Sequence, residues 1–184
     1  VQWSVKNGSG TQAYLKEQLK GVPLIDYSLP YEAVTKAKPD LILMGTSSAV
    51  ANGKYAQYNK IAPTYVVKNG TTVTWRQTFL DVAKVVNRQA KAKKVLAKYD
   101  KQVQTTRQAL KKSGQHKVAV LWVTNNTAYM VNDNSASGAL LYQDLQLGEP
   151  SLVKQVSKSA TADWSAVSLE KLAKLDADDI FLVN

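Results

Sequence analysis

The sequence predicts an α/β protein made of two small lobes, with mainly parallel sheets, joined by one long α-helix. Short apolar strands alternate with amphipathic helices, a pattern typical of parallel sheets covered by helices. One unusually long helical pattern, at about residues 88–112, separates two such series. A helix–turn–strand unit also occurs twice, at residues 31–44 and 169–183.

The first series opens with a helical pattern at residues 11–20, which Gly21 would end as a C-terminal cap. A short strand is predicted at residues 22–26. Pro30 lies near the first turn of the next helix, and Pro39 forces that helix to end.

The apolar run at residues 40–44 predicts a buried strand, since both of its faces are apolar as in a parallel sheet. A loop of small residues at 45–54 follows it. The pattern then predicts a helix at 55–61, a strand at 63–67 and, after a polar loop, a helix at 75–86.

Apolar side chains recur at three- and four-residue spacing along the long helix, as in an amphipathic helix. These are Val85, Ala92, Val95, Leu96, Tyr99, Val103, Thr106 and Leu110. A helix of this length spans about 37 Å, enough to bridge two lobes. We therefore expect an N-terminal lobe at residues 1–87, a connecting helix at 88–114 and a C-terminal lobe, incomplete, at 115–184.

The second series starts with a strand at residues 117–123, an Asn-Asn turn and a strand at 127–131. A loop leading into a helix follows at 132–145. The last helix and strand are predicted at 168–175 and 178–183.

The net charge of +10 is concentrated in one segment. Residues 81–117 hold eleven Lys or Arg and two Asp, and the lysines fill the helix face opposite the apolar one. The simplest interpretation is a solvated basic face. Attraction to an anionic surface is the alternative, and nucleic acid is disfavoured because the helix lacks interleaved aromatic residues.

The residue types of most catalytic and metal sites are missing from the sequence. There is no cysteine, and His116 is the one histidine, so neither a histidine triad nor a thiolate site can be built. Two S-x-x-K matches, at 151–154 and 168–171, lack the companion motifs of penicillin-recognising enzymes. Ser168 is better explained as a helix N-cap. We expect no enzyme activity, no cofactor and no directly bound metal.

Polar and aromatic residues follow several predicted strands, where ligands of α/β sheets bind. The predicted ligand-binding residues are Thr46, Ser47, Trp75 and Arg76 from the first lobe, with Trp122, Tyr129 and Ser137 from the second. Arginine offers a fixed fork of donors to an anionic group, so Arg76 is the favoured cation.

Six segments occur in a characteristic order: "AVTKAKPDLILMGTSS", "YNKIAPTYVV", "TWRQTF", "VLAKYDKQV", "SASGALLYQDLQL" and "VSLEKLAKLDADDIFLV". Together they resemble the iron-siderophore branch of the ABC-transporter solute-binding proteins. That class, with its long helical backbone, also includes haem and cobalamin binders.

The resemblance implies a monomeric receptor outside the cytoplasm, periplasmic or lipid-anchored to the cell membrane, that holds a ferric chelate in a cleft between its lobes. It would deliver the chelate to a membrane permease. Many relatives carry an arginine about where Trp122 stands, so a hydroxamate or mixed chelate suits this chain better than a highly charged tricatecholate. The family pattern extends beyond both ends of this sequence, which we therefore expect to lack parts of the full fold.

Two alternative functions remain open on the sequence. One is a haem or cobalamin receptor on the same fold. The other, from a different class, is a basic module that binds an anionic surface or nucleic acid, whose binding would weaken steeply with salt.

The repeated unit places a glutamate at matched positions, Glu32 and Glu170, 138 residues apart. In cobalamin-binding members of the family, one glutamate at the tip of each lobe meets arginines of the permease. The resemblance therefore implies a permease-docking role for both residues. The alternative is that each merely favours the first turn of its helix.

Overall fold

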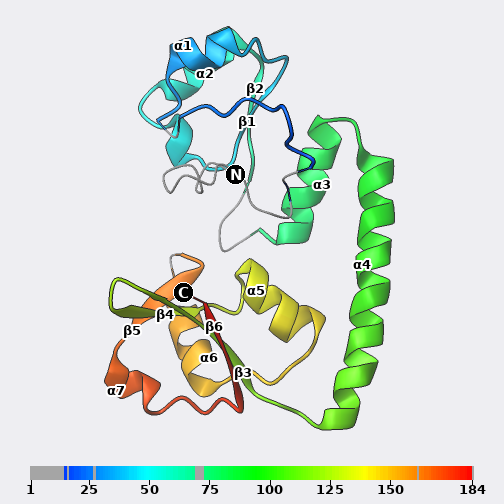
Figure 1. Ribbon diagram of the computed structural model, residues 1–184, viewed down its shortest axis with the longest axis vertical. Coiled ribbons are helices and arrows are strands. Elements are labelled where there is room, and N and C mark those ends of the chain that lie inside the picture. The colour runs from blue at the N-terminus through cyan, green and yellow to red at the C-terminus, as the bar shows by residue number, and fades with distance from the viewer. Residues whose placement is uncertain (1–14, 16, 27, 69–72, 161, 184) are drawn as a thin grey trace. The chain divides into compact units, whose positions relative to one another are not determined.

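The structure, a computed structural model, consists of two compact units, Val1–Val67 and Lys68–Asn184 (Figure 1). The residues described are 15, 17–26, 28–68, 73–160 and 162–183. Among these residues, no helix is both long enough and apolar enough to span a lipid bilayer.

The first unit is a small parallel α/β arrangement. Its elements are α1 (Tyr31–Lys36), β1 (Ile42–Met44), the short 3₁₀ helix η3 (Ser48–Val50), α2 (Lys54–Ile61) and β2 (Thr64–Val66). Strands β1 and β2 pair in parallel, with Ile42 opposite Thr64. Tyr58 of α2 is buried in the core with Val34, and its hydroxyl donates to the carbonyl of Leu29 at 2.7 Å. The predicted helix–strand–helix–strand order is confirmed.

One predicted strand of this unit is wrong. Residues 22–26 form no strand, although the segment reads as apolar. Pro23 has no backbone N–H to donate to a neighbouring strand. The segment would therefore form one hydrogen bond fewer with a sheet. The predicted helix at 11–20 lies mostly outside the described residues; within it, residues 17–20 form turns that end at Gly21, whose φ is +79°.

The second unit begins with two helices that pack side by side, α3 (Trp75–Val85) and α4 (Gln89–Leu110). A capping box starts α3: Gln77 N–H donates to the Thr74 hydroxyl, while the Gln77 side chain accepts from the Thr74 N–H. Asn87, with φ of 53°, makes the turn between the helices in a left-handed conformation that asparagine tolerates. The long helix continues for one 3₁₀ turn, η4 (Lys111–Ser113).

The compact division places α3 with α4, because these helices pack on each other and α3 follows the boundary after Val67. The functional division into a lobe at 1–87, a helix at 88–114 and a lobe at 115–184 stays a prediction.

A four-stranded sheet in the order β5-β4-β3-β6 forms the centre of the second unit. The strands are β3 (Val118–Thr124), β4 (Thr127–Val131), β5 (Trp164–Val167) and β6 (Asp179–Val183). The sheet is mixed rather than mainly parallel, since only β3 and β6 run in parallel. Asn125 and Asn126 both have positive φ, and this two-residue turn folds β3 and β4 into a hairpin.

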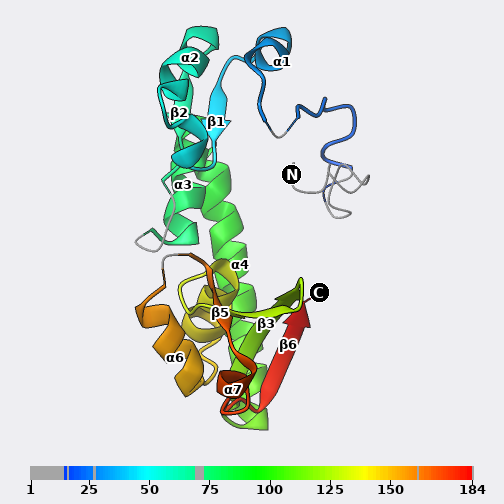
Figure 2. The same ribbon diagram turned by 90° about the vertical axis from the view of Figure 1, so that its left-hand side faces the viewer.

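Each face of this sheet packs against a different helix. Helix α6 (Ser151–Lys158) lies beside the sheet (Figure 2). It buries Leu152, Val153 and Val156 against Ala119 and Leu121. The opposite face carries Val118 and Val120, which pack against Leu141 of the π-helical segment η5 (Ala139–Asp144). The short helices α5 (Ala136–Gly138) and α7 (Leu169–Leu172) complete the unit.

Helix α6 and strand β5 are not among the elements that the sequence predicts. The apolar residues of α6 recur with helical spacing after Pro150, which was the available signal.

A row of aspartates fastens β6 to the start of β3. Lys117 N–H donates to Asp178 at 2.7 Å, and Lys117 Nζ lies 2.7 Å from an oxygen of Asp176. His116 Nδ1 lies 2.8 Å from Asp179. Asp176 also accepts from the backbone N–H of Ser151, the first residue of α6, at 2.8 Å. Asp176 therefore ties β3, α6 and the segment before β6 together.

The ammonium of Lys117, with the N–H and hydroxyl of Ser151, holds the pKa of Asp176 well below its usual range. We predict that Asp176→Asn lowers the melting temperature at neutral pH. The difference from the native protein should shrink as pH falls below about 4, where the unfolded aspartate is protonated. Asp163→Asn, which removes the same charge from an exposed site of the same unit, is the control. Equal melting temperatures of all three proteins at neutral pH would contradict this role of Asp176.

Candidate functional site

An aromatic patch, made of Trp122, Tyr129 and Trp164, lies on the sheet of the second unit. Trp122 of β3 stands opposite Tyr129 of β4 in the strand register. Trp164 of β5 meets Trp122 edge-on, with ring centroids 5.4 Å apart and planes at 73°. Such edge-to-face pairs are a favoured aromatic geometry.

The register places the aromatic patch on one face of the sheet. Trp164 is opposite Val131, which lies two residues from Tyr129 and therefore on the same face. Along β3, Val118 and Val120 of this face are buried beneath η5, whereas Trp122 is only half-buried and Trp164 is 40% exposed. The aromatic patch is thus the accessible continuation of the covered face, towards the end of β3.

The loop after β4 is held by its own polar side chains. Ser135 Oγ donates to the carbonyl of Asn132 at 2.7 Å and accepts from the N–H of Gly138 at 3.0 Å. A Cβ on Gly138 would lie 2.0 Å from the Asn132 carbonyl oxygen, so only glycine fits there. Ser137, a predicted ligand residue, is exposed in α5 between these two anchors.

Arg76 does not stand free as the predicted cation. Its guanidinium lies 2.7 Å from Asp100 of α4 and 3.2 Å from Asp144 at the end of η5. It also lies over the rings of Trp75 and Tyr99, at 4.8 and 5.0 Å from their centroids. Two carboxylates and two aromatic faces therefore already satisfy this arginine.

Asp144 is the centre of this cluster. One of its carboxylate oxygens accepts from Arg76 and the other from the Tyr99 hydroxyl at 2.6 Å. Arg107 of α4 donates to the backbone carbonyls of Asp144 and Gln143. The Asp144 cluster, defined as Arg76, Tyr99, Asp100, Arg107 and Asp144, joins α3, α4 and η5.

The pKa values in this cluster reflect its burial and charge. Burial, followed by the hydrogen bond to Asp144, raises the pKa of Tyr99 to about 12. Partial burial opposes the charge of Arg76, but the two carboxylates outweigh it and raise the pKa of the guanidinium. Both groups keep their protons at neutral pH, so the cluster acts as a fixed set of donors around Asp144.

The predicted residues of the first unit follow β1, as expected. The Thr46 hydroxyl lies 3.0 Å from that of Ser48 and accepts from the N–H of Ala49 at 3.4 Å, at the start of η3. Ser47 is exposed and makes no capping hydrogen bond. A ligand could therefore reach the Ser47 hydroxyl without breaking a cap.

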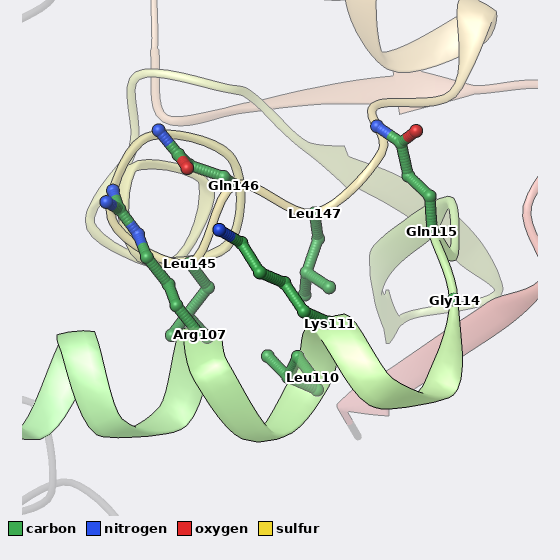
Figure 3. Close-up of a pocket in the computed structure, with 8 residues that line it drawn as sticks. All are labelled: Arg107, Leu110, Lys111, Gly114, Gln115, Leu145, Gln146 and Leu147. Carbon is green, nitrogen blue, oxygen red and sulfur yellow. The ribbon is translucent and has the colours of Figure 1, made fainter.

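A separate pocket of about 290 Å³ lies between the end of α4 and the segment after η5 (Figure 3). Leu110, Leu145 and Leu147 give it apolar walls, while Arg107 and Lys111 give it cations. None of the seven predicted ligand residues lines it.

Within the described part of the chain, no group of three or more His, Asp or Glu side chains converges as a metal site. The site residues predicted from the sequence do not include Trp164, Asp144 or Asp100. Asp100 was detectable, because it is an isolated acid in a lysine-rich helix. Trp164 could not be identified from the sequence, since its segment carries no recognised helix, strand or family pattern.

The Asp144 cluster generates a stability prediction. A lysine at position 76 could neither bridge two carboxylates in a fixed fork nor cover two rings. We expect Arg76→Lys to lower the free energy of unfolding by about 1 kcal/mol, measured by urea denaturation. Arg88→Lys, at an exposed arginine before α4, should leave it unchanged. Equal stability of the two variants would show that the contacts of Arg76 add little to the stability of the second unit.

Comparison with known proteins places this chain among solute-binding proteins. A family model described as "Periplasmic binding protein" matches residues 9–184. The iron(3+)-hydroxamate-binding protein FhuD of Bacillus subtilis (strain 168) is 31% identical over 170 residues, which cover 91% of this chain and 53% of the relative. The probable siderophore-binding lipoprotein YfiY of the same organism is 30% identical over 175 residues, covering 91% and 52%. The chain spans about half the length of these curated relatives.

Solved structures confirm the α/β fold class. FhuD2 of Staphylococcus aureus with bound ferrioxamine B has a TM-score of 0.79 at 24% identity, over 99% of this chain and 73% of that one. SirA of the same organism, complexed with staphyloferrin B, has a TM-score of 0.79 at 23% identity, over 96% and 60%. The relatives are binding proteins by name, and the family implies a location outside the cytoplasm. The resemblance in the motifs is confirmed: this chain belongs to the periplasmic binding protein family.

Proposed function

We propose that this protein is the extracytoplasmic binding component of an ABC importer and captures a ferric siderophore, with a hydroxamate-type chelate favoured. The observation that carries this proposal is the aromatic patch at the end of β3, in a chain whose relatives are named for iron-hydroxamate and siderophore binding. The protein would bind the chelate through side chains and would act as a receptor rather than an enzyme.

The chemistry of the site favours a ligand of low charge. Hydroxamate anions can balance the charge of the ferric ion, whereas catecholate dianions leave an excess of negative charge. The most prominent candidate cation, Arg76, is already paired with Asp100 and Asp144. An aromatic wall formed by Trp122 and Trp164 offers dispersion contacts to the organic shell of a chelate and does not require a charged ligand.

Additional polar contacts complete the proposed ligand set. Ser137 is exposed in α5, on the loop that follows β4. Thr46 and Ser47 of the first unit, together with Trp75, remain proposed contacts from the predicted set. Arg76 is proposed to position the other site residues through the Asp144 cluster. It would contact a ligand directly only if that ligand displaced Asp100 or Asp144 from its guanidinium.

Titration of tryptophan fluorescence tests the ligand class. We expect saturable quenching by a ferric hydroxamate, and weaker quenching by a ferric tricatecholate, haem or cobalamin. Trp122→Ala should weaken hydroxamate binding by about 2 kcal/mol, roughly thirtyfold, because the aromatic patch loses the ring that meets Trp164 edge-on. Tyr55→Ala, which removes an exposed aromatic residue of the first unit, should not change the affinity.

The ligand panel also decides between the alternatives. Saturable binding of haem or cobalamin with no response to any ferric siderophore would assign the protein to another ligand class on the same fold. Equal affinity of the native protein and Trp122→Ala for the hydroxamate would remove the aromatic patch from the site.

Permease docking is proposed for Glu32 and Glu170. Both are exposed, and each is the second residue of its helix, α1 in the first unit and α7 in the second. Tyr31 and Leu169, which begin these helices, are also 138 residues apart. An acidic residue in the first turn complements the helix dipole while its carboxylate stays accessible to a cationic partner.

We predict that the double variant Glu32→Ala, Glu170→Ala abolishes uptake of the chelate by cells while leaving its affinity in solution unchanged. The matched control, Asp40→Ala with Asp163→Ala, removes one exposed acid from each unit and should support normal uptake. Normal uptake by the glutamate double variant would return both residues to the role of helix-start residues.

A further inference from the structure

We propose that the outer face of α4 is a docking surface for an anionic phospholipid membrane. The surface is a lysine stripe, defined as Lys91, Lys94, Lys98 and Lys101. This role goes beyond ligand capture and permease docking, since none of these lysines belongs to the proposed ligand or docking residues.

The spacing of the four lysines makes a straight row. Intervals of three, four and three residues keep side chains on one face of an α-helix. The row extends for about 15 Å at 1.5 Å per residue. All four side chains are exposed, and the buried residues of α4, Ala92 and Val103, lie on the other side of the helix. The lysine stripe therefore faces away from the packing face of α4.

No carboxylate among the described residues pairs with this row. Asp100 is the one acidic residue of α4, and its carboxylate is paired with Arg76. No residue of the lysine stripe forms an ion pair within the part of the chain that the structure describes. Like charges three and four residues apart repel each other and destabilise a helix. An external anionic surface would relieve this repulsion along the whole row.

The composition of the stripe favours a lipid surface over nucleic acid. Lysine ammonium groups act as point charges suited to diffuse headgroup charge, whereas arginine would give bidentate recognition of individual phosphates. Proteins that bind single-stranded nucleic acid also use exposed aromatic residues, on which the bases stack. Between Lys91 and Lys101 the one aromatic residue is Tyr99. Its ring packs edge-on against that of Trp75, with ring centroids 5.1 Å apart. The family also implies a location outside the cytoplasm.

Vesicle co-sedimentation tests this proposal. The full chain should bind vesicles that contain phosphatidylglycerol and should not bind pure phosphatidylcholine vesicles. Raising the NaCl concentration should release it, because surface charges are screened within a Debye length. Replacing Lys91, Lys94, Lys98 and Lys101 by Gln should reduce the partition coefficient at least about tenfold. Glutamine is a good helix former, and far-ultraviolet circular dichroism checks that α4 persists.

A control with the same net charge separates the lysine stripe from charge in general. It replaces four exposed lysines elsewhere, Lys54, Lys60, Lys158 and Lys174, by Gln and should retain vesicle binding. Equal loss in both variants would overturn the proposal, as would no binding of the native chain to the anionic vesicles. Tighter binding to duplex DNA than to the vesicles at the same salt would assign the surface to nucleic acid instead. Chelate titration of the stripe variant should be unchanged, so this test and that of the proposed function fail independently.

Discussion

The carboxylate of Asp144 is the interaction on which the second unit depends. It accepts from Arg76 of α3 and from Tyr99 of α4, while Arg107 donates to the carbonyl of the same residue. These contacts fix the end of η5 against both helices. Because Leu141 of η5 covers one end of the sheet face that carries the aromatic patch, the Asp144 cluster also determines which part of that face is buried and which part stays accessible.

The cations of the chain fall into groups with different surroundings. Arg76 and Arg107 are engaged by acceptors inside the second unit, and the ammonium of Lys117 is paired with Asp176. The lysine stripe has no such partners among the described residues. Arg76, Arg107 and Lys117 hold elements together: carboxylates balance the charges of Arg76 and Lys117, whereas Arg107 donates to backbone carbonyls. The four positive charges of the lysine stripe therefore stay without ion-pair partners among the described residues and act on the solvent outside α4.

Local periodicity predicted most elements, because the spacing of apolar residues directly records which face of a helix or strand is buried. It identified α3, α4 and the β3–β4 hairpin, and failed at residues 22–26, where an apolar run forms no strand. It could not identify the partners of Arg76, since Asp144 is 68 residues away in the chain. A cation that looked available in the sequence is neutralised by a contact that no local pattern contains.

The two copies of the helix–turn–strand unit share one sequence pattern but are stabilised by different contacts. In both copies an apolar residue of the helix packs inward, Val34 in the first unit and Leu172 in the second. The second copy carries a longer row of aspartates before its strand, and these bind His116, Lys117 and the start of α6. Both ring nitrogens of His116 face oxygen atoms, and the hydrogen bond to Asp179 is the main cause of its raised pKa. The start of β6 is therefore held by charge-assisted contacts, which compensate for a strand whose apolar side chains are largely exposed.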